Sequence, residues 1–363
     1  MRNIYSVFKG SGSYIPETIV KNADFMGRKF FNAQGEPMAK PIAEIIEKFQ
    51  EITCIRERRY IREEQSTSEI ATLAARNAIE SSGIDPETLD YVIVAHNFGD
   101  VSADNRRSDF VPSLASRVKQ SLGIANPYAI AYDIAFGCPG WLQAVIQADY
   151  YLRSGHAKRA LVIGSESLSR ISDSADVDSM IYSDGAGAVI MEAVESDDPV
   201  GIITHATRSD TIQHAKLLTM GSSYDPDFAG NDLFLKMNGH KLYKYALSTV
   251  PEAIKNCIDK ANLTLDDIKK VLIHQANEKM DEEILNRVFS LYGIKDQIAE
   301  KVKQIMPMTI SWLGNSSVAT LPTLYDLITK GKVEDHSMLS GGNYVFASVG
   351  AGMNVNCMVY KMI

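Results

Sequence analysis

The stretch Ala131-Tyr132-Asp133-Ile134-Ala135-Phe136-Gly137-Cys138-Pro139-Gly140-Trp141 predicts a strand that gives way to a helix. Apolar residues at positions 142, 145, 146 and 152 follow at the spacing of a helix packed on one side, and Pro139 suits a first helical residue. Cys138 therefore lies where unpaired amides and the helix dipole favour a thiolate. The flanking glycines let other atoms approach the sulfur. We predict that Cys138 is a nucleophile rather than a buried structural cysteine.

Composition narrows the class of protein. A chain of 363 residues can form two ordinary domains or one large one. The net charge is −8 with both signs interspersed, which argues against a nucleic-acid binder. No apolar run is long enough for a membrane span, and residues 1–6 lack the apolar core of a signal peptide, so we expect a cytoplasmic protein. The four cysteines lie far apart, so we expect neither disulfides nor a metal site, and no cofactor.

One segment of the chain recurs at an offset of 179 residues. Residues 83–95 match 262–274 position for position, and the same shift places Cys138 opposite Ser317. We therefore predict an α/β fold made of two similar halves. The first half, 1–195, carries Cys138 and an insertion at about 26–47, and the second half is 196–363. Chance agreement between amphipathic segments is the alternative explanation.

Further reactive side chains follow predicted strands. His274 ends a strand over 271–273, Asn315 follows a strand expected to begin at Met308, and the last strand runs into Gly350-Ala351-Gly352. Ligands of α/β sheets bind beyond the carboxyl ends of strands, so we expect these residues to meet Cys138. A lone histidine is more often structural, and an asparagine before a helix is usually a cap. The combination of all four motifs indicates a site.

A thiolate, an imidazole and a carboxamide in one pocket can perform acyl transfer. Cys138 would attack a thioester and hold the acyl group covalently. Glycine-region amides, together with the Cys138 N–H, would stabilise the tetrahedral oxyanion. His274 and Asn315 would donate to one carbonyl oxygen and so stabilise the enolate that decarboxylation of a malonyl thioester produces.

Together these motifs resemble the β-ketoacyl-acyl-carrier-protein synthase III group of the thiolase superfamily over nearly the whole chain. The resemblance rests on Gly137-Cys138, Ser183-Asp184-Gly185-Ala186-Gly187-Ala188, His274-Gln275-Ala276-Asn277, Gly314-Asn315-Ser316-Ser317 and Gly350-Ala351-Gly352. It implies a thiolase-like five-layer αβαβα fold, a homodimer, a Cys138, His274 and Asn315 triad, and an oxyanion hole formed by the N–H groups of Cys138 and Gly352.

The resemblance also implies a reaction. A Cys-bound acyl group would condense with a malonyl- or 3-oxoacyl-carrier-protein thioester, with loss of carbon dioxide, in fatty-acid or specialised lipid or polyketide biosynthesis. Acyl carrier protein is the implied partner, and coenzyme A thioesters are a second candidate donor. The residues that usually grip coenzyme A are replaced by residues around Lys48 and Ile52, and the loop 165–183 lacks the expected Arg near its end. These departures favour a carrier-bound donor and an acyl group larger than acetyl.

The resemblance suggests further candidates around the site. Residues 110–122 have helical spacing, and Phe110, Val111 and Met353 are candidates for the acyl pocket or a loop at the dimer interface. Candidates for docking the acidic carrier protein are Lys244, Lys279 and Lys241. A solvated charged helix face explains each lysine alone equally well.

Two other functions compete with this interpretation. A related condensing enzyme that joins two longer acyl chains would need a glutamate from residues 96–120, where only Asp100, Asp104 and Asp109 could substitute. A catalytically silent partner subunit is the second alternative. Retention of cysteine, histidine and asparagine together speaks against it, and selective iodoacetamide labelling of Cys138 would discriminate.

Overall fold

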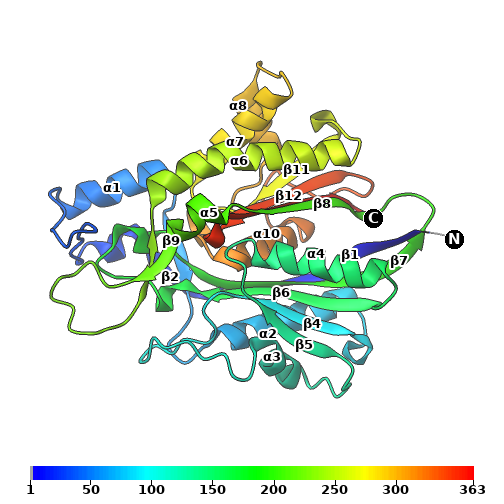
Figure 1. The fold of residues 1–363 in the computed structure, drawn as a ribbon, viewed down its shortest axis with the longest axis horizontal. Coiled ribbons are helices and arrows are strands. Elements are labelled where there is room, and N and C mark those ends of the chain that lie inside the picture. Colours follow the sequence, from blue (N-terminus) through cyan, green and yellow to red (C-terminus); the bar gives the residue numbers. More distant parts are fainter. Residues whose placement is uncertain (1–2) are drawn as a thin grey trace.

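Each half of the chain builds one large β-sheet (Figure 1) in the computed structural model, which describes residues 3–363. A smaller, two-stranded sheet accompanies each of them. The first sheet contains, in spatial order, β1 (Asn3–Tyr14), β7 (Asp184–Ser196), β6 (Arg159–Ser167), β4 (Tyr91–Ala95) and β5 (Ile130–Ile134). Strand β4 is parallel to β5 and β6, whereas β7 is antiparallel to both of its neighbours. The central strands are continuous apolar runs because helices cover both faces.

The second sheet repeats this order. It contains β8 (Gly201–Ser209), β13 (Asn354–Lys361), β12 (Asn343–Gly350) and β11 (Ile268–Ile273). Strands β11 and β12 are parallel and the other pairs are antiparallel, so the four strands match β1, β7, β6 and β4. Within residues 3–363, only β5 has no counterpart. The predicted division at 195/196 falls at the end of β7, and it stays a prediction.

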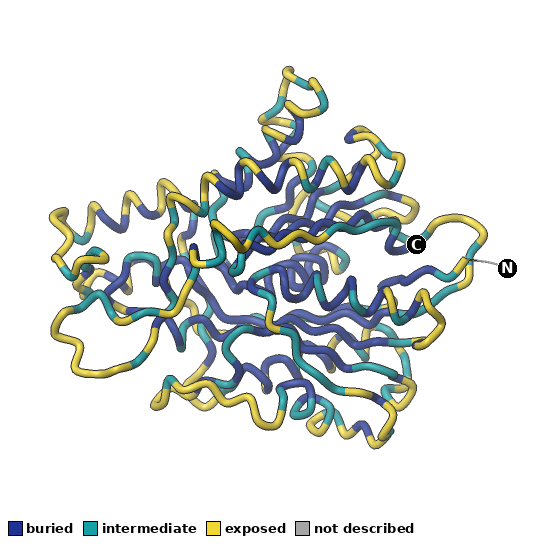
Figure 2. Tube along the Cα trace, viewed as in Figure 1, coloured by how far each residue is buried: buried dark blue, intermediate teal, exposed yellow. Residues whose placement is uncertain are grey.

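Helices complete five layers. The central layer between the sheets holds α4 (Gly140–Arg153) and α10 (Thr320–Thr329). One outer layer holds α2 (Thr67–Ser82) and α3 (Leu114–Leu122), and the other holds α6 (Gly239–Lys260) and α7 (Glu278–Leu291). Figure 2 shows the inner strands and central helices buried and the outer helices exposed on one face. The predicted thiolase-like αβαβα fold is confirmed.

Helix α2 illustrates how local sequence sets these layers. Ser66 accepts a hydrogen bond from the Glu69 N–H, and the Glu69 carboxylate accepts one from the Ser66 N–H, which satisfies two otherwise unpaired amides. Gly83 ends the helix with φ 67°, a left-handed conformation that glycine adopts without strain. Small residues on the inner face bring the helix close to the sheet, namely Ala71, Ala74, Ala75 and Ala78, all fully buried.

Two predicted elements are wrong. The helix expected over 110–122 begins only at Leu114, because Pro112 precedes Ser113, whose side chain caps the helix. The strand expected from Met308 is absent, and a short helix, α9 (Ile310–Leu313), stands where a counterpart of β5 would lie. Apolar periodicity over so few residues does not separate a strand from a helix turn.

Smaller elements complete the fold. They are β2 (Thr18–Lys21), β3 (Glu57–Tyr60), α1 (Ile42–Thr53), α5 (Thr211–His214), β9 (Leu218–Gly221), β10 (Phe234–Met237), α8 (Ile298–Ile305) and the short 3₁₀ turns η1 (Asn22–Phe25), η2 (Pro86–Thr88), η3 (Leu168–Arg170), η4 (Val177–Met180), η5 (Ala215–Leu217), η6 (Leu265–Asp267), η7 (Ser317–Ala319) and η8 (Ala351–Met353). Strands β2 and β3 form one of the two-stranded sheets, and β9 and β10 form the other. In Figure 1, α1 and β9 lie at the same end of the molecule, which is where the cavity described below opens.

A buried guanidinium holds part of this end together. Arg58 on β3 is fully buried and donates from Nε and Nη2 to the Met180 carbonyl oxygen at 3.0 and 2.8 Å. It also donates to the Val20 carbonyl oxygen and the Asn22 side chain, at 3.1 and 2.7 Å. Burial lowers the pKa of Arg58 to about 10. These four bonds compensate the cost of burying the cation, so η4 is tied to β2 and β3.

Candidate active site

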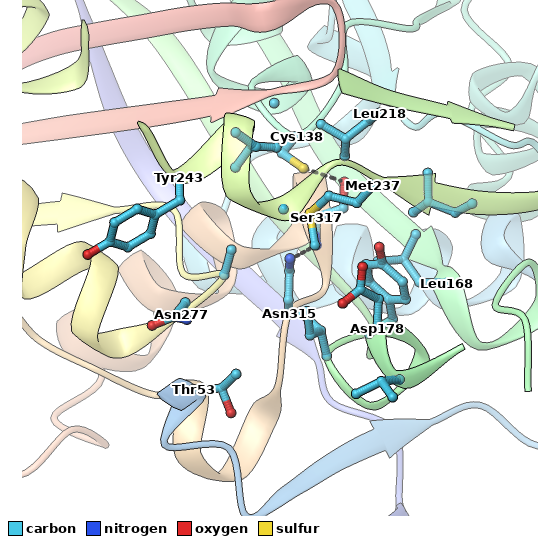
Figure 3. Close-up of a pocket in the computed structure, with 18 of the residues that line it drawn as sticks. Thr53, Cys138, Leu168, Asp178, Leu218, Met237, Tyr243, Asn277, Asn315 and Ser317 are labelled. Carbon is cyan, nitrogen blue, oxygen red and sulfur yellow. Dashed lines mark hydrogen bonds between the residues drawn. The ribbon is translucent and has the colours of Figure 1, made fainter. Parts of the chain in front are cut away.

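A single cavity of about 860 Å³ collects the three residues singled out in the sequence. Cys138, His274 and Asn315 all line it, although they come from different elements. Figure 3 shows Cys138 and Asn315 in this cavity. The other lining residues are mostly apolar and come from α1, η3, η4, β9, β10 and the start of α6. The structure thus brings the predicted triad together at the carboxyl ends of β5 and β11, where the sheet rule places ligand sites.

Cys138 lies two residues before α4, with Pro139 as the helix N-cap rather than the first helical residue. The Ser317 hydroxyl donates to the Cys138 sulfur at 3.4 Å. Burial raises the pKa of the Cys138 thiol to about 11, and the Glu166 charge adds to the rise while Ser317 opposes it. Burial therefore opposes the thiolate that the helix terminus is expected to favour, and the stabilised thiolate stays a prediction.

Asn315 is held with its amide in a defined orientation. Its N–H donates to the Ile181 carbonyl oxygen at 3.0 Å, and its own carbonyl oxygen accepts from the Ser183 N–H at 2.8 Å. The side-chain Oδ1 accepts from the Ser317 N–H at 2.8 Å. Since a backbone N–H only donates, the oxygen must face Ser317, and the Asn315 NH₂ group remains available to donate.

His274 is 4% exposed and follows β11, where its N–H donates to the Ala347 carbonyl oxygen of β12 at 2.8 Å. Burial lowers its pKa to about 4, so the ring is neutral at physiological pH. Nδ1 is enclosed and has no hydrogen-bond partner among residues 3–363. Because His274 lines the cavity, the nitrogen that reaches a substrate is Nε2.

Glycines allow the chain after β12 to approach Cys138. A Cβ on Gly137 (φ 67°) would lie 2.7 Å from the Ala351 backbone, and one on Gly350 would lie 2.5 Å from the Cys138 nitrogen. Both positions therefore exclude side chains. Gly350 and Ala351 line the cavity, and Gly352 follows them with φ 79°. The predicted role of the Gly352 N–H in an oxyanion hole stays a prediction.

A polar network behind Cys138 was not anticipated from the sequence. The Asn97 amide donates to Glu166 at 2.7 Å and to the Ser317 hydroxyl at 3.4 Å, and its oxygen accepts from the Gly137 N–H at 2.9 Å. Burial raises the pKa of Glu166 to about 7. The internal repeat had already placed Ser317 opposite Cys138, and that pairing was the one available signal for this network.

The other predicted pocket residues lie elsewhere. Met353 is fully buried in the core beneath α6 and does not line the cavity, so its assignment to the acyl pocket is wrong. Phe110 and Val111 do not line this chain's cavity either and are exposed, Val111 at 86%. Their alternative role, in a loop at a dimer interface, stays a prediction.

The three predicted docking lysines are exposed near the cavity mouth. Lys241 and Lys244 lie in the first turns of α6, beside the lining residues His240 and Tyr243. Lys279 lies at the start of α7, next to the lining residue Met280. Among residues 3–363, no group of three or more His, Cys, Asp or Glu side chains is placed to hold a metal ion.

The fold and the cavity define a condensing enzyme of the thiolase type, and comparisons identify the family. The family described as 3-oxoacyl-[acyl-carrier-protein] synthase III matches residues 132–211, and its C-terminal domain matches residues 258–362. The chain therefore belongs to the 3-oxoacyl-[acyl-carrier-protein] synthase III family, as the sequence motifs indicated, and is an acyltransferase of that family.

Individual relatives agree over nearly the whole chain. The β-ketoacyl-[acyl-carrier-protein] synthase III of Erythrobacter litoralis is 32% identical over 96% of this chain and 97% of its own length. The enzyme of the same name from Staphylococcus aureus strain Newman is 32% identical over 97% of each chain. The crystal structure of 3-oxoacyl-[acyl-carrier-protein] synthase III from Aquifex aeolicus VF5 superposes with a TM-score of 0.76, at 26% identity, over 98% of this chain and 99% of that one.

Proposed function

We propose that the chain joins an acyl group held on Cys138 to a malonyl group delivered on acyl carrier protein, as a 3-oxoacyl-carrier-protein synthase of fatty-acid biosynthesis. The observation that carries this proposal is the meeting of Cys138, His274 and Asn315 in one largely apolar cavity. Family membership supports the reaction type. Retention of all three groups speaks against a silent partner subunit.

In the first step, the acyl group is loaded. Cys138 loses its proton to solvent, and the thiolate attacks the carbonyl carbon of the donor thioester. The tetrahedral oxyanion receives hydrogen bonds from the backbone N–H groups of Cys138 and Gly352, each contributing about 3 kcal/mol. Collapse breaks the bond to the donor sulfur, which leaves as a thiolate and takes a proton from solvent. Ser317 stabilises the Cys138 sulfur whenever it is charged.

In the second step, the malonyl thioester loses carbon dioxide. The carbon–carbon bond breaks and its electron pair forms an enolate, whose oxygen accepts hydrogen bonds from His274 Nε2–H and the Asn315 NH₂ group. The enolate carbon attacks the acyl carbonyl on Cys138, and the thiolate leaves as the new carbon–carbon bond forms. The Cys138 thiolate then recovers its proton from solvent. This sequence requires no redox cofactor.

Mass spectrometry of the intact protein tests the proposal. Incubation with acyl-carrier and coenzyme A thioesters should add one acyl mass at Cys138, and malonyl-carrier protein should then remove it as a 3-oxoacyl product. The cavity of about 860 Å³ supports an acyl group larger than acetyl. Strong preference for acetyl-coenzyme A over medium-chain donors would contradict that part of the proposal.

The proposal includes a homodimer in the cytoplasm. No strand of residues 3–363 pairs with the outer edge of β5, and Tyr128, Ile130 and Val111 are exposed on or near that edge. An open strand edge with apolar side chains favours pairing with a second copy. Light scattering should give a dimer that Val111→Asp weakens, whereas Ile212→Asp, at a fully exposed residue on α5, should not. A monomeric natural protein would contradict the dimer.

Carrier-protein docking at Lys241, Lys244 and Lys279 is part of the same proposal, because their positive charges flank the cavity mouth. Reversing Lys244 and Lys279 to Glu should raise the KM for carrier-bound substrate about 10-fold, through lost attraction to an acidic partner. Lys332→Glu, at an exposed lysine just past α10, is the matched control. Unchanged carrier-dependent turnover in the double variant would contradict docking of the carrier protein at this surface.

A further inference from the structure

Two polar side chains interrupt the apolar wall of the cavity formed by η3, η4 and β10. The wall contains Leu168, Val177, Ile181, Leu235 and Met237, which offer only hydrocarbon or thioether surface. Asp178 and Tyr182 line the same cavity. In Figure 3, Asp178 lies beside Leu168 and Met237, on the same side of Asn315.

Tyr182 has an unused hydroxyl group. The residue is 4% exposed, and its hydroxyl is enclosed without a hydrogen-bond partner among residues 3–363. Its backbone forms a parallel bridge with that of Asn315, so the two residues are neighbours in the cavity wall. Buried tyrosine hydroxyls nearly always find a partner, and one left unpaired at a ligand cavity indicates that a ligand supplies it.

Asp178 is the unpaired member of an acidic group. Lys236 donates to both Asp173 and Asp176, whereas no hydrogen bond to the Asp178 carboxyl group occurs among the described residues. Burial raises the pKa of Asp178 to about 7, and the neighbouring Asp176 charge adds to the rise. The carboxyl group therefore has free capacity to accept a hydrogen bond inside the cavity.

These two groups are poorly matched to a plain alkyl chain. A hydrocarbon that displaces water from this wall leaves a carboxyl group and a phenol without partners, and each unpaired buried group costs about 1–3 kcal/mol. A hydroxyl or a secondary amide matches both, because it donates to Asp178 and accepts from Tyr182. The acyl group or the pantetheine arm of a thioester can supply such a group.

Resting on the proposed function, we propose that Asp178 and Tyr182 form a polar subsite that binds a hydroxyl or secondary amide of the thioester substrate, within the cavity that contains Cys138. The subsite selects substrates by a hydrogen-bonding group and not by apolar volume alone. It is a binding element and takes no part in bond making or breaking.

Acyl loading on Cys138 tests this subsite. The donors are octanoyl thioesters and a series with a hydroxyl at successive carbons, each prepared on pantetheine and on ethanethiol, which has no amide. Tyr182→Phe and Asp178→Leu should each slow loading of the matched donor about 10-fold, the effect of one lost hydrogen bond. Tyr245→Phe is the control, because its hydroxyl already bonds Asp210 and lies outside the cavity lining.

The donor series identifies the source of the bound group. If loading is slowed only for acyl chains that carry a hydroxyl, on pantetheine and on ethanethiol alike, the subsite binds the acyl chain. If loading is slowed for every pantetheine donor and for no ethanethiol donor, the subsite binds the pantetheine arm. Natural loading rates for all donors in both variants would overturn the proposal. Absence of any mass on Cys138 in the natural protein would instead overturn the proposed function. Unchanged melting temperature and iodoacetamide labelling confirm that the variants fold.

Discussion

The two halves of the chain share a sheet order and a central helix but differ at the start of that helix. The first half places Cys138 there, and the second half places Ser317, whose hydroxyl lies 3.4 Å from the cysteine sulfur. The first half also keeps a fifth strand, β5, where the second has the short helix α9. One plan therefore serves two tasks in the proposed reaction: the first half supplies the nucleophile and the second supplies the hydrogen-bond donors. The first half also has an open sheet edge.

The strongest test of this comparison replaces each of the two equivalent side chains, in separate variants, by alanine. Cys138→Ala should reduce condensation at least about 10⁴-fold, because the covalent intermediate is lost. Ser317→Ala should reduce loading only about 10-fold, because it removes one hydrogen bond. Steady-state turnover and intact mass measure both. Equal losses would show that the two halves do not divide the work as described.

A second comparison separates the two donors of the second half from the nucleophile of the first. Asn315→Ala should lower malonyl decarboxylation about 10²- to 10³-fold while leaving loading of Cys138 nearly unchanged, since the amide serves only the enolate. His274→Ala should lower decarboxylation by a similar factor and also leave loading nearly unchanged, because Nε2–H donates to the same enolate oxygen. Carbon dioxide release and acyl mass report the two steps separately. Loss of loading in Asn315→Ala would refute the assignment.

The pH dependence of Cys138 labelling tests how the starts of the two central helices affect the thiol. Since burial raises the pKa of Cys138 to about 11, iodoacetamide labelling of the resting enzyme should rise about tenfold per unit between pH 7 and 10. Ser317 lowers that pKa, so Ser317→Ala raises it and should slow labelling about 3- to 10-fold at any pH below it. A plateau already reached at pH 8 would mean that the thiolate exists at rest.

The smallest expected effect concerns the opposite ends of the central helices. Gly155 after α4 and Gly331 after α10 have φ 75° and 66°, and an added Cβ meets nothing within 4 Å at either position. Alanine at each should lower the free energy of unfolding by about 1 kcal/mol, from backbone strain alone. Chemical denaturation measures both. A difference of more than about 1 kcal/mol between them would show that the helix ends are not equivalent.

The fold could be predicted from the sequence because strand and helix periods repeat between the halves. An element boundary that occurs twice at the same offset is stronger evidence than a boundary that occurs once. Sequence reasoning also predicted that Cys138, His274 and Asn315 lie together, because each was expected to follow a strand whose carboxyl end lies at the same edge of the fold. It failed to predict the structure that follows Met308 and the buried position of Met353, because short apolar segments fit a strand, a turn or a core equally well. Asp178 and Tyr182 were missed because they are distinguished by the hydrogen-bond partners that their side chains lack, and only coordinates reveal such an absence.

The guanidinium of Arg58 has a practical consequence for redesign. By fixing the Met180 carbonyl oxygen, it ties the η4 part of the cavity wall to β3. Strand β10 is held to the same wall by the ion pairs of Lys236 with Asp173 and Asp176, whereas β9 pairs with no strand other than β10 among residues 3–363. Libraries meant to retune chain-length preference should therefore vary Leu218 and Met220 on β9, and leave the residues that Arg58 and Lys236 anchor intact.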